Sequence, residues 1–159
     1  MKNMRVFKRQ MNDEQTLDLL KKGEYGILST IDVENQPFGT PLSYIFMEGS
    51  IYFHCATVGT KIDNIKNNSK VCFTVVGKTE ILPAEFSTNY ESVMAFGSAT
   101  IINGEEKIDA LRAILKKYSR NYYEEGMKYI EQANDKVKVV KIKLEDFTGK
   151  HRVQGNHPL

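Results

Sequence analysis

Tryptophan is absent from this sequence of 159 residues, and cysteine occurs only twice. Cys55 and Cys72 lie in different segments, and a disulfide-stabilised protein of this kind needs more cysteines. We therefore expect two reduced thiols and a cytoplasmic protein. Proline is scarce as well, with 4 residues, and no Pro- or Gly-rich linker divides the chain. The composition predicts one domain over residues 1–152, followed by a short C-terminal tail, residues 153–159.

Neither sign of charge is in excess, and long apolar runs are missing. Lys and Arg number 22 and Asp and Glu 20, for a formal net charge of +2, and no basic block interleaved with aromatic residues occurs. No apolar run approaches the roughly 20 residues that a transmembrane helix needs. The first ten residues carry basic side chains without the apolar stretch of a signal peptide. We therefore expect neither nucleic acid nor a membrane as partner.

Six segments have the alternation or the short apolar run that is typical of β-strands. They are residues 25–31, 38–46, 50–55, 70–76, 91–102 and 136–144. Pro41 predicts an irregular or edge position within the second strand, and the polar stretch 78–90 around Pro83 predicts a loop. In the last strand, Val139 and Val140 are adjacent where the alternation slips, which predicts a β-bulge.

Helices are expected between and beside these strands. Asn12 is a candidate N-cap and Gly23 a candidate end for a helix over residues 13–22. A short helix over residues 61–66 follows, with Thr60 as its cap, and two more lie between residues 104 and 135. The whole pattern predicts an α+β fold: a six-stranded, mostly antiparallel, closed or split β-barrel with peripheral helices.

The segment with the most chemical information is residues 51–65, where a strand leads through a turn of small residues into a helix. Free backbone N–H groups and the helix dipole favour an anion at such a helix start, and Lys61 adds a positive charge. The local pattern also fits a simpler interpretation, in which Thr60 is an ordinary cap and Lys61 a solvated side chain. The glycines of a Walker A loop are missing.

His54 is open to a structural and a functional interpretation. It should face away from Phe53 along the strand, and its neighbour Cys55 should face away from it. The other histidines, His151 and His157, lie near the C-terminus, so no metal site is expected. The sequence also lacks a nucleophile elbow and a dinucleotide-binding fingerprint. Its acidic residues fall mostly at caps, turns and helix surfaces, so it shows no apparatus for acid/base hydrolysis.

Taken together, several short segments resemble the nitroimidazole-resistance proteins of the pyridoxamine 5′-phosphate oxidase-like flavin-binding superfamily. The matching segments are residues 23–30, 36–44, 51–56, 61–65, 71–77, 88–93 and 148–150. They extend over nearly the whole chain, from residue 5 to residue 152. The resemblance implies an FMN-binding split barrel and a homodimer with two FMN sites at its interface.

The resemblance also implies which residues hold the cofactor. The isoalloxazine ring would be lined, largely through backbone groups, by Thr40, Pro41, Leu42 and Ser43. The ribityl chain and phosphate would be reached from His54, Cys55, Ala56, Thr60, Lys61 and Asn64. Glu91 and Ser92 would contribute from the partner subunit. His54 becomes the candidate catalytic residue, as a proton donor or as a group that orients the substrate.

Two functions from different classes follow from this resemblance. The first is an FMN-dependent oxidoreductase that reduces small electron-poor substrates such as nitroaromatics. The second is a non-catalytic flavin or haem carrier or sensor, and a module with a vestigial site is a remote third. The true oxidase grips the phosphates of cofactor and substrate with several arginines, whereas the turn Gly59-Thr60-Lys61 has none. This difference argues against oxidation of pyridoxamine phosphate.

Overall fold

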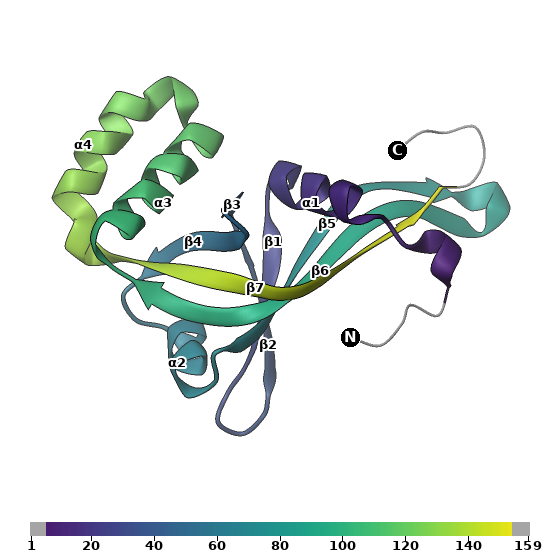
Figure 1. Ribbon diagram of the computed structural model, residues 1–159, viewed down its shortest axis with the longest axis horizontal. Coiled ribbons are helices and arrows are strands. Elements are labelled where there is room, and N and C mark those ends of the chain that lie inside the picture. Colours follow the sequence, from purple (N-terminus) through teal and green to yellow (C-terminus); the bar gives the residue numbers. More distant parts are fainter. Residues whose placement is uncertain (1–5, 154–159) are drawn as a thin grey trace.

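The computed structural model describes residues 6–153 (Figure 1). Its helices are α1 (Asp13–Lys22), α2 (Thr60–Asn67), α3 (Gly104–Tyr118) and α4 (Tyr123–Ala133), and its strands are β1 (Gly26–Ile31), β2 (Pro37–Leu42), β3 (Ile45–Met47), β4 (Ser50–Ala56), β5 (Lys70–Leu82), β6 (Ser87–Ile102) and β7 (Val137–Arg152). Short 3-10 turns occur at Phe7–Arg9, Pro83–Glu85, Arg120–Tyr122 and Asn134–Lys136. The α+β class is therefore confirmed. Of the expected tail, residues 153–159, all but residue 153 lie outside the described residues.

The seven strands form a single antiparallel sheet in the order β2-β1-β5-β6-β7-β4-β3. Its edge strands, β2 and β3, are consecutive in the chain and are joined only through Ser43 and Tyr44. The sheet must therefore curl until its two edges approach each other at this link. The expectation of six strands is wrong because residues 38–46 form two strands. The backbone N–H of Tyr44 donates to the Tyr118 hydroxyl rather than to a neighbouring strand, at 3.0 Å.

The prediction of a loop over residues 78–90 is also wrong. β5 and β6 continue their pairing beyond an irregularity after Val76, from Thr79 opposite Tyr90 to Leu82 opposite Ser87. β7 accompanies them to its last residue, because Arg152 pairs with Tyr90. The outer parts of these three strands extend away from the body of the molecule as an arm (Figure 1).

Val139 and Val140 lie in regular pairing, so the bulge predicted there is wrong. Val140 pairs with Phe53, and Val139 pairs with His54, without a shift of register. Both valines are fully buried, but in different places. Val140 belongs to the main core, the cluster that fills the curled sheet, and Val139 belongs to a second cluster under α3 and α4. Two adjacent apolar residues are needed because both faces of β7 are covered at this point.

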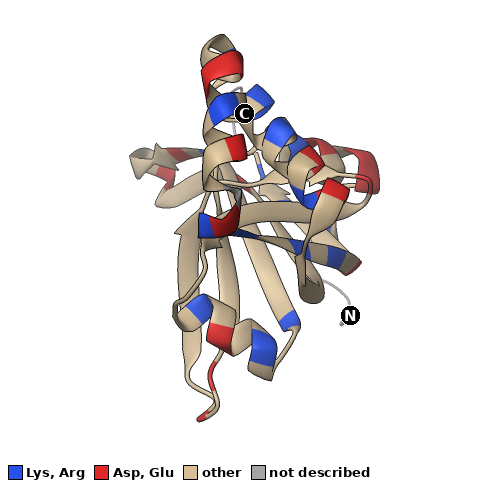
Figure 2. Ribbon diagram, turned by 90° about the vertical axis from the view of Figure 1, so that its left-hand side faces the viewer, with Lys and Arg blue, Asp and Glu red and all other residues tan. Residues whose placement is uncertain are grey.

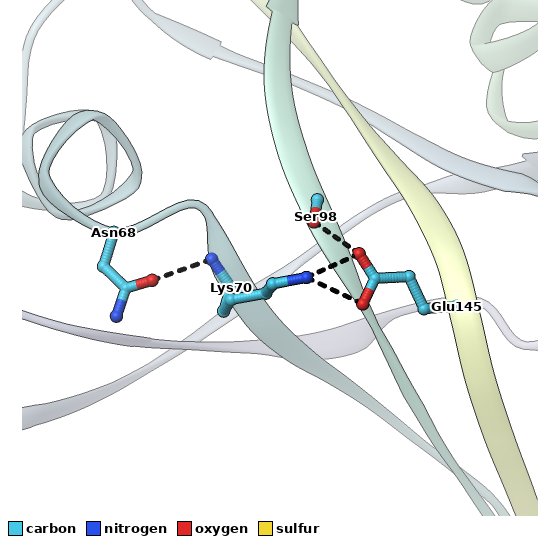
Figure 3. A network of polar contacts seen from close by, with 4 residues as sticks. All are labelled: Asn68, Lys70, Ser98 and Glu145. Carbon is cyan, nitrogen blue, oxygen red and sulfur yellow. Dashed lines mark hydrogen bonds and ion pairs between the residues drawn. The ribbon is translucent and has the colours of Figure 1, made fainter.

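The bulge of β7 lies instead at Glu145. Phe96 pairs with Asp146 and Gly97 with Leu144, so Glu145 has no partner on β6. Its carboxylate turns outward, where both oxygens accept from Lys70 Nζ at 2.8 Å and one also accepts from the Ser98 hydroxyl (Figure 3). Both charged side chains are about half exposed or more. Such a pair contributes about 0–1 kcal/mol.

α1 lies against β3 and against β5, β6 and β7. Its start is as predicted: the Asn12 side chain accepts from Gln15 N at 2.8 Å, and the Gln15 side chain accepts from Asn12 N at 3.1 Å. This reciprocal pair is a capping box. Gly23 ends the helix, and a Cβ there would lie 2.6 Å from the Tyr44 hydroxyl. Only glycine therefore allows α1 to approach the β2–β3 link so closely.

Candidate functional site

The start of α2 is the feature of the fold that is best suited to an anion. Gly59, which precedes the helix, has φ +137°, a conformation that favours glycine. Gly59 is also the N-cap and has no side chain with which to bond the N–H groups of the first turn. Ile62 N donates to Gly59 O at 2.9 Å, which leaves the N–H groups of Thr60 and Lys61 as the donors for an anion. The prediction that Thr60 caps this helix is therefore wrong. Backbone donors without a side-chain cap, at the positive end of the helix dipole, form an environment in which a phosphate is stabilised.

Lys61 brings a positive charge to the same turn. Its side chain is half-buried, and its charge acts to lower the pKa of Cys55. Burial outweighs this effect and raises the pKa of the Cys55 thiol overall. Cys55 packs against the main core, so it behaves as a small apolar side chain. The end of β4 and the start of α2 are thus close enough for their side chains to interact electrostatically.

Asn64 fixes α2 to the sheet. Its side chain is buried, and Nδ2 donates to Thr30 Oγ1 on β1 at 3.0 Å. β1 in turn pairs with β2, with Leu28 opposite Thr40 and Gly26 opposite Leu42. The segment 40–43 therefore runs away from α2, over the roughly 13 Å of strand between Thr30 and Gly26. This contact makes Asn64 a structural tether, and its direct contact with a cofactor stays a prediction.

His54 lies on the face of β4 opposite to Phe53, as predicted. Phe53 is fully buried in the main core, whereas His54 is exposed beside the cluster under α3 and α4. Neighbouring protein atoms nevertheless lower the pKa of the His54 imidazole from its usual value of 6.5 by desolvation. The ring is therefore neutral at pH 7, with one nitrogen that donates and one that accepts a hydrogen bond.

Glu91 and Ser92 do not join these residues within one chain. Ala99, further along β6, donates its N–H to Ser69 O just after α2. Glu91 precedes Ala99 by eight residues, which corresponds to about 26 Å of strand. Glu91 instead accepts from Lys78 N at 3.2 Å and lines a cleft of about 800 Å³ between α1 and the arm.

The outer face of β5 and β6 carries apolar and small polar side chains. Cys72 and Phe96 are opposite each other, as are Thr74 and Met94, and the residues between them face the core. Val76 and Met94 remain 46% and 43% exposed. We call these five residues, Cys72, Thr74, Val76, Met94 and Phe96, the outer face. An exposed strip of this kind is more apolar than an ordinary surface strand.

Two residues that contact the β2–β3 link were missed from sequence. Lys117 and Tyr118, the last residues of α3, bond to the backbone of Tyr44. A lysine and a tyrosine at the end of an amphipathic helix are ordinary, and their partners lie more than 70 residues away in the chain. No local pattern reveals such a contact.

The structure also bears on the distribution of charge, on metal binding and on membrane insertion. Basic and acidic residues are interspersed over the helices (Figure 2). Among residues 6–153, no cluster of three or more His, Cys, Asp or Glu side chains is placed to hold a metal ion. None of the described helices combines the length and the apolar character that crossing a membrane requires.

The sequence model of the pyridoxamine 5′-phosphate oxidase family matches residues 12–151. The chain belongs to this family. The resemblance on which the sequence analysis rested is thereby confirmed, although none of the curated proteins matches the chain significantly. The match includes every candidate site residue from Thr40 to Ser92.

Solved structures with the same fold include members with different cofactors. A 5-nitroimidazole antibiotic resistance protein from Bacteroides thetaiotaomicron has a TM-score of 0.73 and 23% identity, over 89% of this chain and 86% of that one. A flavocytochrome from Azotobacter vinelandii has a TM-score of 0.75 and 20% identity, over 96% of this chain and 73% of that one. An FAD- and haem-binding protein from Mycobacterium smegmatis has a TM-score of 0.70 and 14% identity, over 95% of this chain and 77% of that one. At these identities the likeness is one of fold.

Proposed function

We propose that this family member binds FMN in a split barrel, with the phosphate at the start of α2. The observation that carries the proposal is the first turn of α2, whose N–H groups no side chain caps and which Lys61 makes positive. A phosphate monoester fits these donors. The isoalloxazine ring then lies along Thr40–Ser43, with the ribityl chain near His54, Cys55 and Ala56.

The geometry of β2 supports this orientation. β2 is an edge strand that pairs only with β1, so the N–H and C=O groups on its other side have no strand as partner. A planar ring with polar atoms along its edge can use such groups. FMN is elongated, with ring and phosphate at opposite ends. Segment 40–43 likewise runs from the middle of β1 past its Gly26 end, away from Thr30, where α2 is tethered.

The reaction that we propose is the reduction of small electron-poor substrates such as nitroaromatics. Bound flavin supplies the electron transfer. As a neutral ring, His54 donates a hydrogen bond from Nδ1 or Nε2 that orients the substrate. Its other proposed role, proton transfer to the substrate, requires the imidazolium form, which the lowered pKa disfavours at pH 7. The lack of arginine at residues 59–61 makes pyridoxamine phosphate an unsuitable substrate.

The site is completed, in our proposal, by a second copy of the chain in a cytoplasmic homodimer. Glu91 and Ser92 lie too far along β6 to reach α2 of their own chain, so they are available to a partner. The outer face offers a surface for self-association, because Val76 and Met94 are nearly half exposed. Such a dimer would remove apolar surface from water.

A non-catalytic flavin or haem carrier is the second candidate. It is favoured by the fold likeness to a flavocytochrome and to an FAD- and haem-binding protein. A carrier would bind its ligand and show no turnover, whereas an enzyme would oxidise a reduced nicotinamide when a nitroaromatic is present.

The visible absorption spectrum of the purified protein tests the proposal. Titration with FMN, FAD and haem should give saturable binding of FMN, followed by nitroaromatic-dependent oxidation of NADH or NADPH. Saturable FMN binding without turnover would favour the carrier. Binding of haem alone, or of no chromophore, would contradict the proposal.

A further inference from the structure

Lys117 makes an unusual set of contacts at the end of α3. Its ammonium donates to Gly23 O at 2.7 Å and to Tyr44 O at 2.9 Å. The same nitrogen lies 4.2 Å from the centre of the Tyr44 ring and 5.2 Å from that of Tyr118. Such positions over aromatic faces are attractive for a cation. Lys117 thus joins the end of α1, the β2–β3 link and α3.

Tyr118 bonds to the same link from the next position. Its hydroxyl oxygen accepts from Tyr44 N at 3.0 Å. Its single hydrogen is shared between Glu24 O at 2.6 Å and Tyr44 O at 2.7 Å. Both backbone polar groups of Tyr44 are therefore satisfied by side chains of α3.

The side chain of Tyr44 holds the link from the core side. It is fully buried, its hydroxyl donates to Leu20 O at 2.6 Å, and its ring contacts the edge of Phe73 with a centroid distance of 4.9 Å. The link therefore has two anchors: a buried ring on the inside, and Lys117 with Tyr118 on the outside. Little freedom remains for the residues that immediately precede Tyr44.

Burying the Lys117 ammonium beside the β2–β3 link costs free energy. Burial lowers the pKa of Lys117, which means that desolvation disfavours its charged form. Within residues 6–153 its polar contacts are carbonyl oxygens, not a carboxylate. An apolar side chain would avoid the cost if filling space were the only requirement. The ammonium donates hydrogen bonds that hold the backbone carbonyls of Gly23 and Tyr44 in place, which an apolar side chain cannot do.

We infer that Lys117 and Tyr118 are positioning residues, which set the place of the Thr40–Ser43 backbone against the flavin ring. The inference rests on the proposed function. β2 is held along one side by β1 and has no strand on the other, so the direction of its C-terminal end depends on how the following link is anchored. The unpaired edge of β2 can bond to a ring only if it is held within a fraction of an ångström.

The experiment compares FMN binding to the full chain and to three variants. Lys117→Met keeps the length of the side chain and removes both hydrogen bonds, and Tyr118→Phe removes only the hydroxyl. Lys116→Met is the control, because Lys116 is exposed on the same turn and its ammonium lies 5.9 Å from the centre of the Tyr123 ring, away from the β2–β3 link. FMN affinity is measured by quenching of flavin fluorescence, and the ring environment by visible circular dichroism of the bound flavin.

We expect Lys117→Met and Tyr118→Phe to weaken FMN binding roughly 10- to 100-fold and to change the visible dichroism at saturation, while Lys116→Met does neither. Far-ultraviolet dichroism identifies the variants that fold, and Tyr118→Phe decides the test if Lys117→Met does not. A purely structural role would lower the melting temperature and leave the FMN affinity and the visible dichroism unchanged. That result would overturn this inference but not the proposed function. If the wild-type chain binds no flavin, the proposed function fails, and the inference fails with it.

Discussion

Tyr44 is the residue at which separate parts of the chain meet. Its hydroxyl donates to a carbonyl at the end of α1, and its backbone bonds to the end of α3. Burial raises the pKa of this phenol well above its usual value, as expected for a hydroxyl that stays protonated in the core.

We expect Tyr44→Phe to lower the free energy of unfolding by about 1–3 kcal/mol, because the Leu20 carbonyl would lose its partner in a buried place. Urea denaturation measures this change. Tyr25→Phe is the control, since Tyr25 is 56% exposed, and it should stay within about 0.5 kcal/mol of the wild type. Equal free energies of unfolding for Tyr44→Phe and Tyr25→Phe would show that the buried hydrogen bond does not stabilise the fold.

His54 makes stability depend on pH in a defined direction. Its pKa in the folded state is below 6.5, the value of an unperturbed histidine. Between pH 6.5 and the folded pKa, the unfolded chain binds more protons at this site, so the free energy of unfolding falls as the pH falls. The contribution fades above pH 6.5 and is nearly absent about one pH unit higher, where the unfolded chain is also almost fully deprotonated at this site.

Denaturation of the wild type and of His54→Gln at pH 8 and at pH 5 measures this contribution. From pH 8 to pH 5, the free energy of unfolding should fall more for the wild type than for the variant. Between pH 7.5 and 8.5 it should change equally in the two proteins. The same loss in both proteins would assign the acid sensitivity to other groups.

The elements divide into those that local sequence specifies and those that distant contacts specify. Asn12 and Gly23 predicted the ends of α1 correctly, because caps act within a few residues. The break between β2 and β3 could not be predicted, since the groups that interrupt the ladder at Tyr44 belong to Lys117 and Tyr118. The hairpin of β5 and β6 was missed for a similar reason. Pro83 and the polar residues around it resemble a loop, but only Pro83–Glu85 form a turn, and pairing between β5 and β6 keeps the residues on either side of it extended.

At α2, the sequence indicated a candidate anion site but not how the start of the helix is built. Lys61 and the small residues before it were the signal for this prediction. The cap was assigned to Thr60, although Gly59, with its positive φ, is the residue at which the helix begins. The tether from Asn64 to Thr30 joins elements that are 34 positions apart, which a local pattern cannot show.

The two-sided burial of β7 gives a direct test at the level of one strand. Val139→Thr and Val140→Thr keep the shape of the side chain and bury an unpartnered hydroxyl, so each should cost about 1–3 kcal/mol. Lys143→Thr, at an exposed position of the same strand, should cost no more than about 0.5 kcal/mol. Urea denaturation compares the three variants. Sensitivity at only one of the valines would contradict the burial of both faces of β7.

At the scale of the whole molecule, the candidate site is divided between two ends of β6. The proposed homodimer predicts that Met94→Lys, on the outer face, reduces the mass measured by light scattering to that of a monomer and weakens FMN binding together with it. In an isolated chain the new lysine would simply extend into solvent, because Met94 is 43% exposed.

Val33→Lys is the matched control for this variant, since Val33 is 76% exposed in the turn between β1 and β2. It should change neither mass nor affinity. A wild-type chain that binds FMN as a monomer would contradict the proposed dimer and leave the α2 site unaffected.

The central claim, that the start of α2 holds the phosphate of FMN, is tested most directly by one titration. FMN binding is measured for the wild type, for Lys61→Ala and for Lys66→Ala, a lysine exposed in the last turn of the same helix. Loss of a charge-assisted hydrogen bond should raise the dissociation constant of Lys61→Ala about 10- to 100-fold, while Lys66→Ala stays at the wild-type value. Equal dissociation constants for all three proteins, or no flavin binding by the wild type, would contradict the claim.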